Sequence, residues 1–153
     1  MTAVEERLAQ LGHTVPQVAA PVAVYVPAMR TGNLIFTSGQ LPMADGALMG
    51  TGKVGAGVTP EQAHAMAERC ALNAIAAIRA EVGDLDRVTR VVKVVGFVAS
   101  DPSFTGQPAV VNGASELLGA AFGDVGVHAR SAVGVCVLPL DAPVEVEVIV
   151  EFS

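Results

Sequence analysis

The sequence predicts an α+β fold, a two-layer sandwich in which one mixed sheet carries two main helices on one of its faces. Two observations support this. Segments with recurring β-branched residues, typical of strands, alternate with two long helical patterns, and no internal repeat or second domain interrupts them. The predicted order is strand, strand, helix, strand, helix, strand, strand, after a short amino-terminal helix. The opposite, apolar face of such a sheet needs a cover, and in a chain of 153 residues another subunit is expected to supply it.

Residues 1–21 are predicted to be a helical extension with a linker, and residues 22–153 to be one domain. Apolar side chains at spacings of four and three indicate a helix over 4–11, which Gly12 ends. The amino terminus lacks the basic head and apolar run of a signal peptide, and no segment offers the ~20 apolar residues that cross a bilayer. We therefore expect a cytoplasmic protein with no membrane partner.

Composition limits the classes of function. The chain is 52% hydrophobic with a net charge of -6, so it can bury a core and repels the phosphate backbone of nucleic acids. Cys70 and Cys136 lie in apolar segments and are expected to be small buried hydrophobes of a reducing compartment, with a single disulfide as the alternative. His13, His64 and His128 are isolated along the chain, so no metal site is expected.

The first hairpin is predicted from two extended runs, 22–27 and 33–38. Residues 28–32 between them are expected to be the connection. The second run leads into Ser38 and Gly39. Gly39 permits a bend in the backbone and leaves amide and carbonyl groups exposed, so a ligand could approach closely there.

A glycine-rich loop is expected over 43–58. Gly50–Gly55 matches the glycine spacing of a dinucleotide-binding fingerprint, but no strand leads into it and the next helix begins several residues later. It also departs from a phosphate-binding P-loop, because Val54 stands where a Ser or Thr would bind magnesium. The sequence therefore favours a flexible loop without a phosphate site.

Two long helices and an interior strand follow. Thr59 can cap a helix that runs to Val82, with a proline in its first turn and a glutamine that completes a capping box. Val88–Ala99 is almost continuously apolar, which is typical of a strand with neighbours on both sides. The second helix is predicted over Pro108–Phe122.

The last two strands carry the most informative charges. They are predicted over 128–135 and 144–152, because apolar side chains alternate with others there. On the first of them Arg130 shares a face with the small residues Ala132 and Gly134, a combination that suits an anion pocket. On the strand predicted over 144–152, Glu145 is the first residue of the polar face. If the two strands form a hairpin, we expect Arg130 and Glu145 to meet across it.

Four separated stretches form a pattern of their own. The carboxy-terminal one consists of Ala129-Arg130-Ser131, Leu138-Pro139 and Val144-Glu145-Val146-Glu147. The others are Tyr25 with Gly32 to Pro42, Val95-Gly96-Phe97-Val98, and Val111-Asn112. Together, over about residues 22–152, they resemble the RidA/YjgF family of reactive-intermediate deaminases, whose older label is L-PSP endoribonuclease.

The resemblance implies a chorismate-mutase-like fold and a homotrimer with ligand clefts between subunits. It implies hydrolytic deamination of enamines and imines that bear a carboxylate, of the 2-aminoacrylate and 2-iminopropanoate type, to a 2-keto acid and ammonia. No cofactor is implied. By the same resemblance, Arg130 holds the substrate carboxylate and Glu145 activates water and returns a proton to the leaving nitrogen. The residues that then line the cleft are Tyr25, Ser38, Gly39, Asn112 and Ala132.

One departure from the family pattern keeps alternatives open. Ala132 occupies the position of the family's active-site cysteine, two residues after the arginine. The first alternative is a trimer that binds or senses small carboxylates without chemistry. The second is RNA cleavage, which the acidic charge and the lack of a His/Lys catalytic set disfavour. A structural or chaperone-like role is not separated from these by the sequence.

Overall fold

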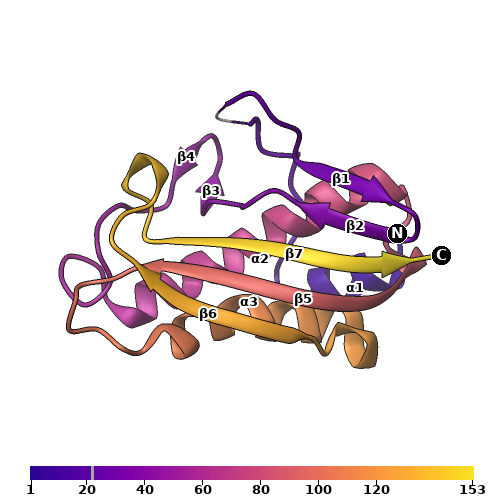
Figure 1. Cartoon of the computed structure of the whole chain (residues 1–153). Helices are drawn as coiled ribbons and strands as arrows, with labels where there is room; N and C mark the ends of the chain where they lie inside the picture. The colour runs from indigo at the N-terminus through magenta and orange to yellow at the C-terminus, as the bar shows by residue number, and fades with distance from the viewer. Residues whose placement is uncertain (22) are drawn as a thin grey trace.

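A five-stranded mixed sheet forms one layer of the molecule, and the helices form the other (Figure 1). The computed structural model describes residues 1–21 and 23–153. In spatial order the strands are β1 (Ala28–Thr31), β2 (Leu34–Thr37), β7 (Val144–Phe152), β5 (Val88–Ala99) and β6 (Ala129–Val135). Strands β5 and β6 run parallel, and the other neighbouring pairs are antiparallel. The predicted α+β class and the order of the main helices and of the five strands of this sheet are confirmed.

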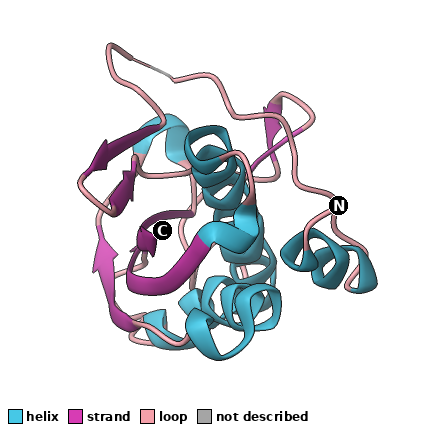
Figure 2. Ribbon diagram, turned by 90° about the vertical axis from the view of Figure 1, so that its right-hand side faces the viewer, coloured by secondary structure: helices cyan, strands magenta, loops and turns pink. Residues whose placement is uncertain are grey.

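The helices gather on one face of the sheet (Figure 2). Helices α2 (Pro60–Val82) and α3 (Gln107–Phe122) pack against the sheet, and the short α1 (Ala3–Gln10) contacts α3. Short 3₁₀ turns precede β5 and β6 (η1, Leu85–Arg87; η2, Gly123–Gly126), and a third precedes β7 (η3, Pro139–Asp141). In the described residues, no helix combines the length and apolarity that a membrane span requires.

Local signals explain where α2 and α1 begin. The hydroxyl of Thr59 accepts a hydrogen bond from the Gln62 amide at 3.1 Å, and the Gln62 side chain accepts one from the Thr59 amide at 2.9 Å. This is the predicted capping box. Thr2 and Glu5 form a second capping box at the start of α1, which the sequence analysis did not identify.

The core lies between α2 and the sheet. Helix α2 presents buried alanines to the sheet, and their small side chains let the helix axis lie close to β7. Every second residue of β7 is buried, from Val144 to Phe152, and Val91, Val94 and Val98 of β5 join them. The intervening residues of both strands face away from the helices, so the two faces of the sheet differ sharply in burial.

Gly113 lets α3 touch the backbone of α2. A Cβ atom at this position would overlap the His64 carbonyl oxygen and lie 2.9 Å from the His64 carbonyl carbon. Because these are backbone atoms, the helices would have to separate. Gly113→Ala is therefore expected to lower the free energy of unfolding by about 2 kcal/mol, measured by urea denaturation.

Gly119 on the same helix provides the matched control. A Cβ atom there would meet no atom within 4 Å, so Gly119→Ala is expected to raise the free energy of unfolding by about 0.5–1 kcal/mol through helix propensity. Equal effects of the two substitutions would show that the close approach of the helices does not limit stability.

The first hairpin differs from the prediction. Residues 23–27 form no strand, Val22 lies outside the described residues, and the predicted connection 28–32 contains β1. Thr31 pairs with Leu34, so the connection is the two residues Gly32 and Asn33. Gly32 has φ +56°, which suits the first central position of a type II′ turn. The Gly-Asn dipeptide was a stronger signal than the apolar run before it.

The glycine-rich loop also contains strands that were not predicted. Strands β3 (Met43–Ala44) and β4 (Ala47–Leu48) form a small separate hairpin. Asp45 and Gly46 between them both have positive φ, as a type I′ turn requires. Beyond β4, the segment with the dinucleotide-like spacing contains a backbone bridge from Val54 to Ser100, and it does not open a helix.

The last two strands do not form a hairpin. Strand β5 lies between β6 and β7, because α3 returns the chain so that β6 runs parallel to β5 on its outer side. The expected meeting of Arg130 and Glu145 across a hairpin is therefore wrong. Cys70 is buried as expected, but Cys136 is exposed, since it follows the end of an edge strand and lies outside the core.

Candidate functional site

A cavity of about 410 Å³ opens beside the start of β7. Four of its lining residues are Tyr25, Ser38, Gly39 and Glu145, which the sequence analysis had assigned to one cleft. Ala23, Leu41 and Pro139 complete the lining. The structure therefore brings together side chains from the segment before β1, the segment after β2, and β7.

A bulge in the pairing of β2 with β7 places Ser38 and Gly39. Phe36 pairs with Ile149, while Gln40 bridges Val146, so the first strand has one more residue than its partner over this interval. Such a bulge bends the strand and redirects its residues. The Ser38 hydroxyl donates to the Val26 carbonyl at 2.6 Å, which ties the segment that carries Tyr25 to the bulge.

The Glu145 carboxyl group lies directly against Gly39. A Cβ atom at position 39 would lie 2.7 Å from Cδ of Glu145, so any other residue would push this side chain away. Burial raises the pKa of Glu145, and the charge of Glu147 raises it further. A carboxyl group whose pKa is raised toward the working pH is suited to both accepting and returning a proton.

The raised pKa of Glu145 leads to a prediction for the free energy of unfolding. A raised pKa in the folded state means that the folded protein favours the protonated form, so ionisation of Glu145 costs stability as the pH rises. Glu145→Gln is therefore expected to be more stable than the wild type at pH 7. The gain is expected to be small, because the group is half-exposed and screened by solvent.

Urea denaturation from pH 4 to pH 8 tests this prediction. The difference between variant and wild type is expected to shrink as the pH falls toward 4, because Glu145 becomes increasingly protonated in both the folded and the unfolded state. A variant that loses stability at pH 7 would contradict the prediction.

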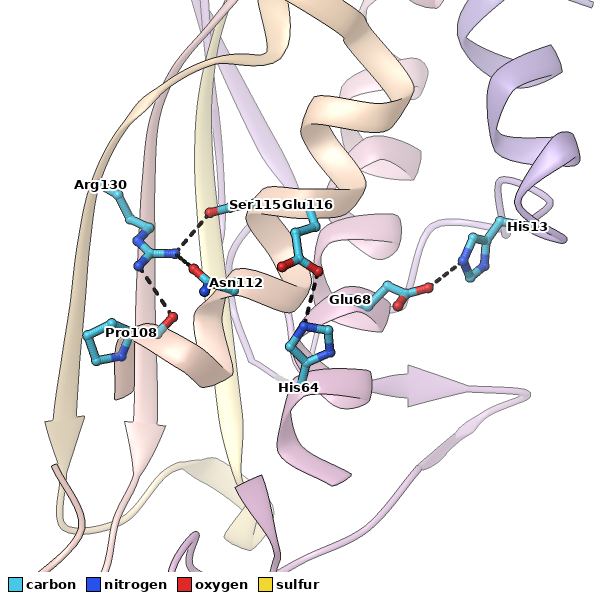
Figure 3. A network of polar contacts seen from close by, with 8 residues as sticks. All are labelled: His13, His64, Glu68, Pro108, Asn112, Ser115, Glu116 and Arg130. Atoms are coloured by element: carbon cyan, nitrogen blue, oxygen red, sulfur yellow. Dashed lines mark hydrogen bonds and ion pairs between the residues drawn. The ribbon is translucent and has the colours of Figure 1, made fainter. Parts of the chain in front are cut away.

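Arg130 belongs to a second group of residues, on β6 and α3 (Figure 3). Its Nη1 donates to Oδ1 of Asn112 at 2.8 Å and to Oγ of Ser115 at 3.2 Å, and its Nη2 donates to the Pro108 carbonyl at 3.3 Å. The three partners lie on one face of α3, at spacings of four and three residues. They hold the guanidinium group over the helix.

These three hydrogen bonds leave two donors of Arg130 unused among the described residues. A guanidinium group has five N–H groups. Both on Nη1 and one on Nη2 are occupied, so the N–H of Nε and the second N–H of Nη2 remain. Two N–H groups of this planar cation are what a carboxylate needs for two parallel hydrogen bonds.

Within one chain the two groups of residues lie on opposite faces of the sheet. Arg130 pairs with Val94, a fully buried residue that faces the helices. Glu145 pairs with Phe97, three residues further along the same strand, whose side chain points the other way. Tyr25, Ser38, Gly39 and Glu145 are thus brought together, and Arg130 and Asn112 are brought together, but the two sets are not. Ala132 lies next to Arg130 along β6 and packs against the core.

Two polar residues beside Arg130 were missed by sequence reasoning. Ser115 contacts Arg130 directly, and His128 Nε2 lies 2.9 Å from the Ser115 hydroxyl. The sequence did contain a signal that both residues lie beside Arg130 and Asn112. Ser115 follows Asn112 at a helical spacing of three, and His128 precedes Arg130 at the strand spacing of two.

Each of the other two histidines contacts one glutamate on a helix. His13 contacts Glu68, and His64 contacts Glu116 at 3.2 Å (Figure 3). Nowhere in residues 1–21 and 23–153 do three His, Cys, Asp or Glu side chains converge as metal ligands would.

A family model described as "YjgF/chorismate mutase-like, putative endoribonuclease" matches residues 5–152. The chain belongs to the RidA/YjgF family. "Protein TCP17" of Trypanosoma cruzi is 47% identical over 151 residues, which are 98% of this chain and 94% of that protein. The chorismate-mutase-like fold expected from the resemblance is therefore confirmed.

Two solved structures match this chain to different degrees. A crystal structure named as a "putative endoribonuclease" from Shewanella oneidensis is 33% identical, with a TM-score of 0.95 over 99% of this chain and 100% of that one. RidA from the Antarctic bacterium Psychrobacter is 27% identical, with a TM-score of 0.62 over 89% of this chain and 94% of that one. The backbone of this RidA/YjgF protein thus follows the Shewanella structure more closely.

Proposed function

We propose that this RidA/YjgF protein hydrolyses imines and enamines that carry a carboxylate and releases a 2-keto acid and ammonia. The observation that carries the proposal is the hydrogen bonding of the Arg130 guanidinium. Three hydrogen bonds hold it in place, and two of its N–H groups have no partner among the described residues. A carboxylate next to the reacting carbon accepts two parallel hydrogen bonds from such a group. Family membership supports the same substrate class.

The chemistry requires water and one proton carrier. Water adds to the carbon of the C=N bond and forms a carbinolamine, whose C–N bond then breaks as the carbonyl forms and ammonia leaves. We assign to Glu145 two proton transfers: it moves a proton from the adding water to the imine nitrogen, and it then moves the hydroxyl proton of the carbinolamine to the same nitrogen, which leaves as ammonia. An enamine enters this sequence after it has tautomerised to the imine. The raised pKa of Glu145 suits it to both transfers. The reaction consumes no electrons, so it needs no redox cofactor.

In this proposal, the cavity residues around Glu145 and the residues around Arg130 come together only where two subunits meet. Arg130 and Glu145 face opposite sides of the sheet in one chain, so a neighbouring chain has to supply one of them. The sheet face away from the helices carries Phe36 (40% exposed) and Val133 (44% exposed), and β6 is an edge strand. Exposed apolar side chains beside an unpaired edge favour association with further copies. We propose a homotrimer with three such clefts.

The direct test is an assay of the wild-type protein with 2-imino acids produced in place by an amino-acid oxidase. The protein is expected to accelerate the formation of 2-keto acid above the spontaneous rate in buffer. An unchanged rate across imines of small, large and acidic amino acids would overturn the proposed hydrolysis.

A second candidate rests on Ala132. The family cysteine is absent at this position, so the cleft could bind a 2-keto acid or another small carboxylate without chemistry. Calorimetric binding of a 2-keto acid without turnover of any imine would favour this candidate. RNA cleavage ranks below both, because the net charge of -6 repels a polyanion and the anchor fits one small carboxylate.

A further inference from the structure

A chain of hydrogen bonds continues behind Arg130. Arg130 Nη1 lies 3.2 Å from the Ser115 hydroxyl, this hydroxyl lies 2.9 Å from His128 Nε2, and His128 Nδ1 lies 2.6 Å from the Gly126 carbonyl. The chain connects α3, η2 and β6. No step proposed above for the hydrolysis uses Ser115 or His128.

The chemistry of its members sets the direction of every bond. The Gly126 carbonyl can only accept, so His128 Nδ1 carries the proton, and in the neutral ring Nε2 then accepts. The Ser115 hydroxyl donates its single proton to Nε2. Its lone pairs are therefore left to face Arg130, whose N–H groups can only donate. His128 thus selects the one orientation of the Ser115 hydroxyl that favours Arg130.

The base of this chain is firmly packed. A Cβ atom on Gly126 would lie 2.5 Å from the Leu118 carbonyl oxygen, so this turn rests directly on the backbone of α3. Arg130, in contrast, is a long side chain on an edge strand, and holding it in one rotamer costs conformational entropy. Because Ser115 offers Arg130 a fixed acceptor, part of this conformational entropy is already lost in the free protein, and ligand binding then costs less free energy.

We propose that Ser115 and His128 are positioning residues that orient Arg130 for the substrate carboxylate. The proposal rests on the proposed function for the identity of the ligand, but the orientation of Arg130 exists without ligand. Ser115 acts on Arg130 directly, and His128 acts through Ser115. Asn112 restrains the same nitrogen, so loss of Ser115 loosens Arg130 but does not release it.

Ser115→Ala and Ser115→Thr form the matched test. Alanine removes the hydroxyl and favours helix, so the variant is expected to fold, while threonine keeps the hydroxyl. With ¹⁵N-labelled arginine, NMR is expected to show restricted rotation of the Arg130 guanidinium in the wild type and in Ser115→Thr, and faster rotation in Ser115→Ala. This readout needs no substrate.

Binding and turnover provide the second readout. Ser115→Ala is expected to raise KM for the imino acid and Kd for pyruvate about 5- to 10-fold, less than the full effect of one hydrogen bond to a charged group, because Asn112 still holds the same nitrogen. The turnover number kcat is expected to change less than about twofold, because the carboxylate is held equally before and during the reaction. If the wild type turns over no imine, the proposed function fails, and the NMR result still decides the positioning role.

His128→Gln and His128→Asn test whether the acceptor at Nε2 of the imidazole is what matters. The Gln oxygen reaches the place of Nε2 and still accepts from Ser115, whereas the Asn amide reaches only the place of Nδ1. We expect His128→Gln to keep slow rotation of Arg130 and His128→Asn to resemble Ser115→Ala. Slow rotation in both Ser115→Ala and His128→Asn would overturn the inference.

Discussion

Arg130→Ala is expected to lower kcat/KM for carboxylate-bearing imines by about 100- to 1,000-fold, because a desolvated charge pair with two hydrogen bonds is lost. Arg130→Lys keeps the charge but lacks the planar fork, so it is expected to recover only a small part of the activity. The measurement is the steady-state rate with imines produced by an amino-acid oxidase.

Arg90→Ala is the control for this substitution. Arg90 is an exposed arginine on β5, and removal of its charge is expected to leave kcat/KM unchanged. The same loss of activity in Arg90→Ala would indicate a general effect of net charge. Full activity in Arg130→Ala would exclude Arg130 as the carboxylate anchor.

Glu145→Gln is expected to lower kcat by about 100-fold or more with little change in KM, because the amide binds similarly but transfers no proton. The same variant is expected to gain stability at neutral pH, so loss of activity would not reflect unfolding. Rates measured together with urea denaturation of the same preparations test both expectations. A variant with wild-type kcat would contradict the proton-transfer role.

Gly39→Ala tests the same carboxyl group from its other side. The added methyl group overlaps the Glu145 side chain, whose flexible end can move away, so the fold is expected to remain while kcat falls. If displacement of Glu145 is the cause, the double variant with Glu145→Gln loses little more than Glu145→Gln alone. Gly57→Ala is the control, because a Cβ atom there meets no atom within 4 Å.

Part of the site followed from the sequence by resemblance. Tyr25, Ser38, Gly39 and Glu145 do line one cavity, and Asn112 does contact Arg130. The roles of these residues stay predictions, as does the trimer. Ser115 and His128 were missed because a hydroxyl and an imidazole gain their function only from what they touch in the folded chain.

The bounds of the long elements could be predicted because their signals are local. Thr59 and Gln62 fix the start of α2, and an unbroken apolar run marks β5. The first hairpin was misplaced although its signal was also local, because Gly32 and Asn33 were assigned to the edges of neighbouring elements.

By itself, the sequence determined the α+β class, the order of the main elements and the family to which the chain belongs. Only the tertiary structure decided that β5 separates β6 from β7 and that a bulge presses Gly39 against Glu145. The physical reason is that alternation along a strand shows which residues share a face, but not which strand becomes its neighbour. That choice depends on packing between segments far apart in the chain, and here it places Arg130 and Glu145 on opposite faces of one sheet.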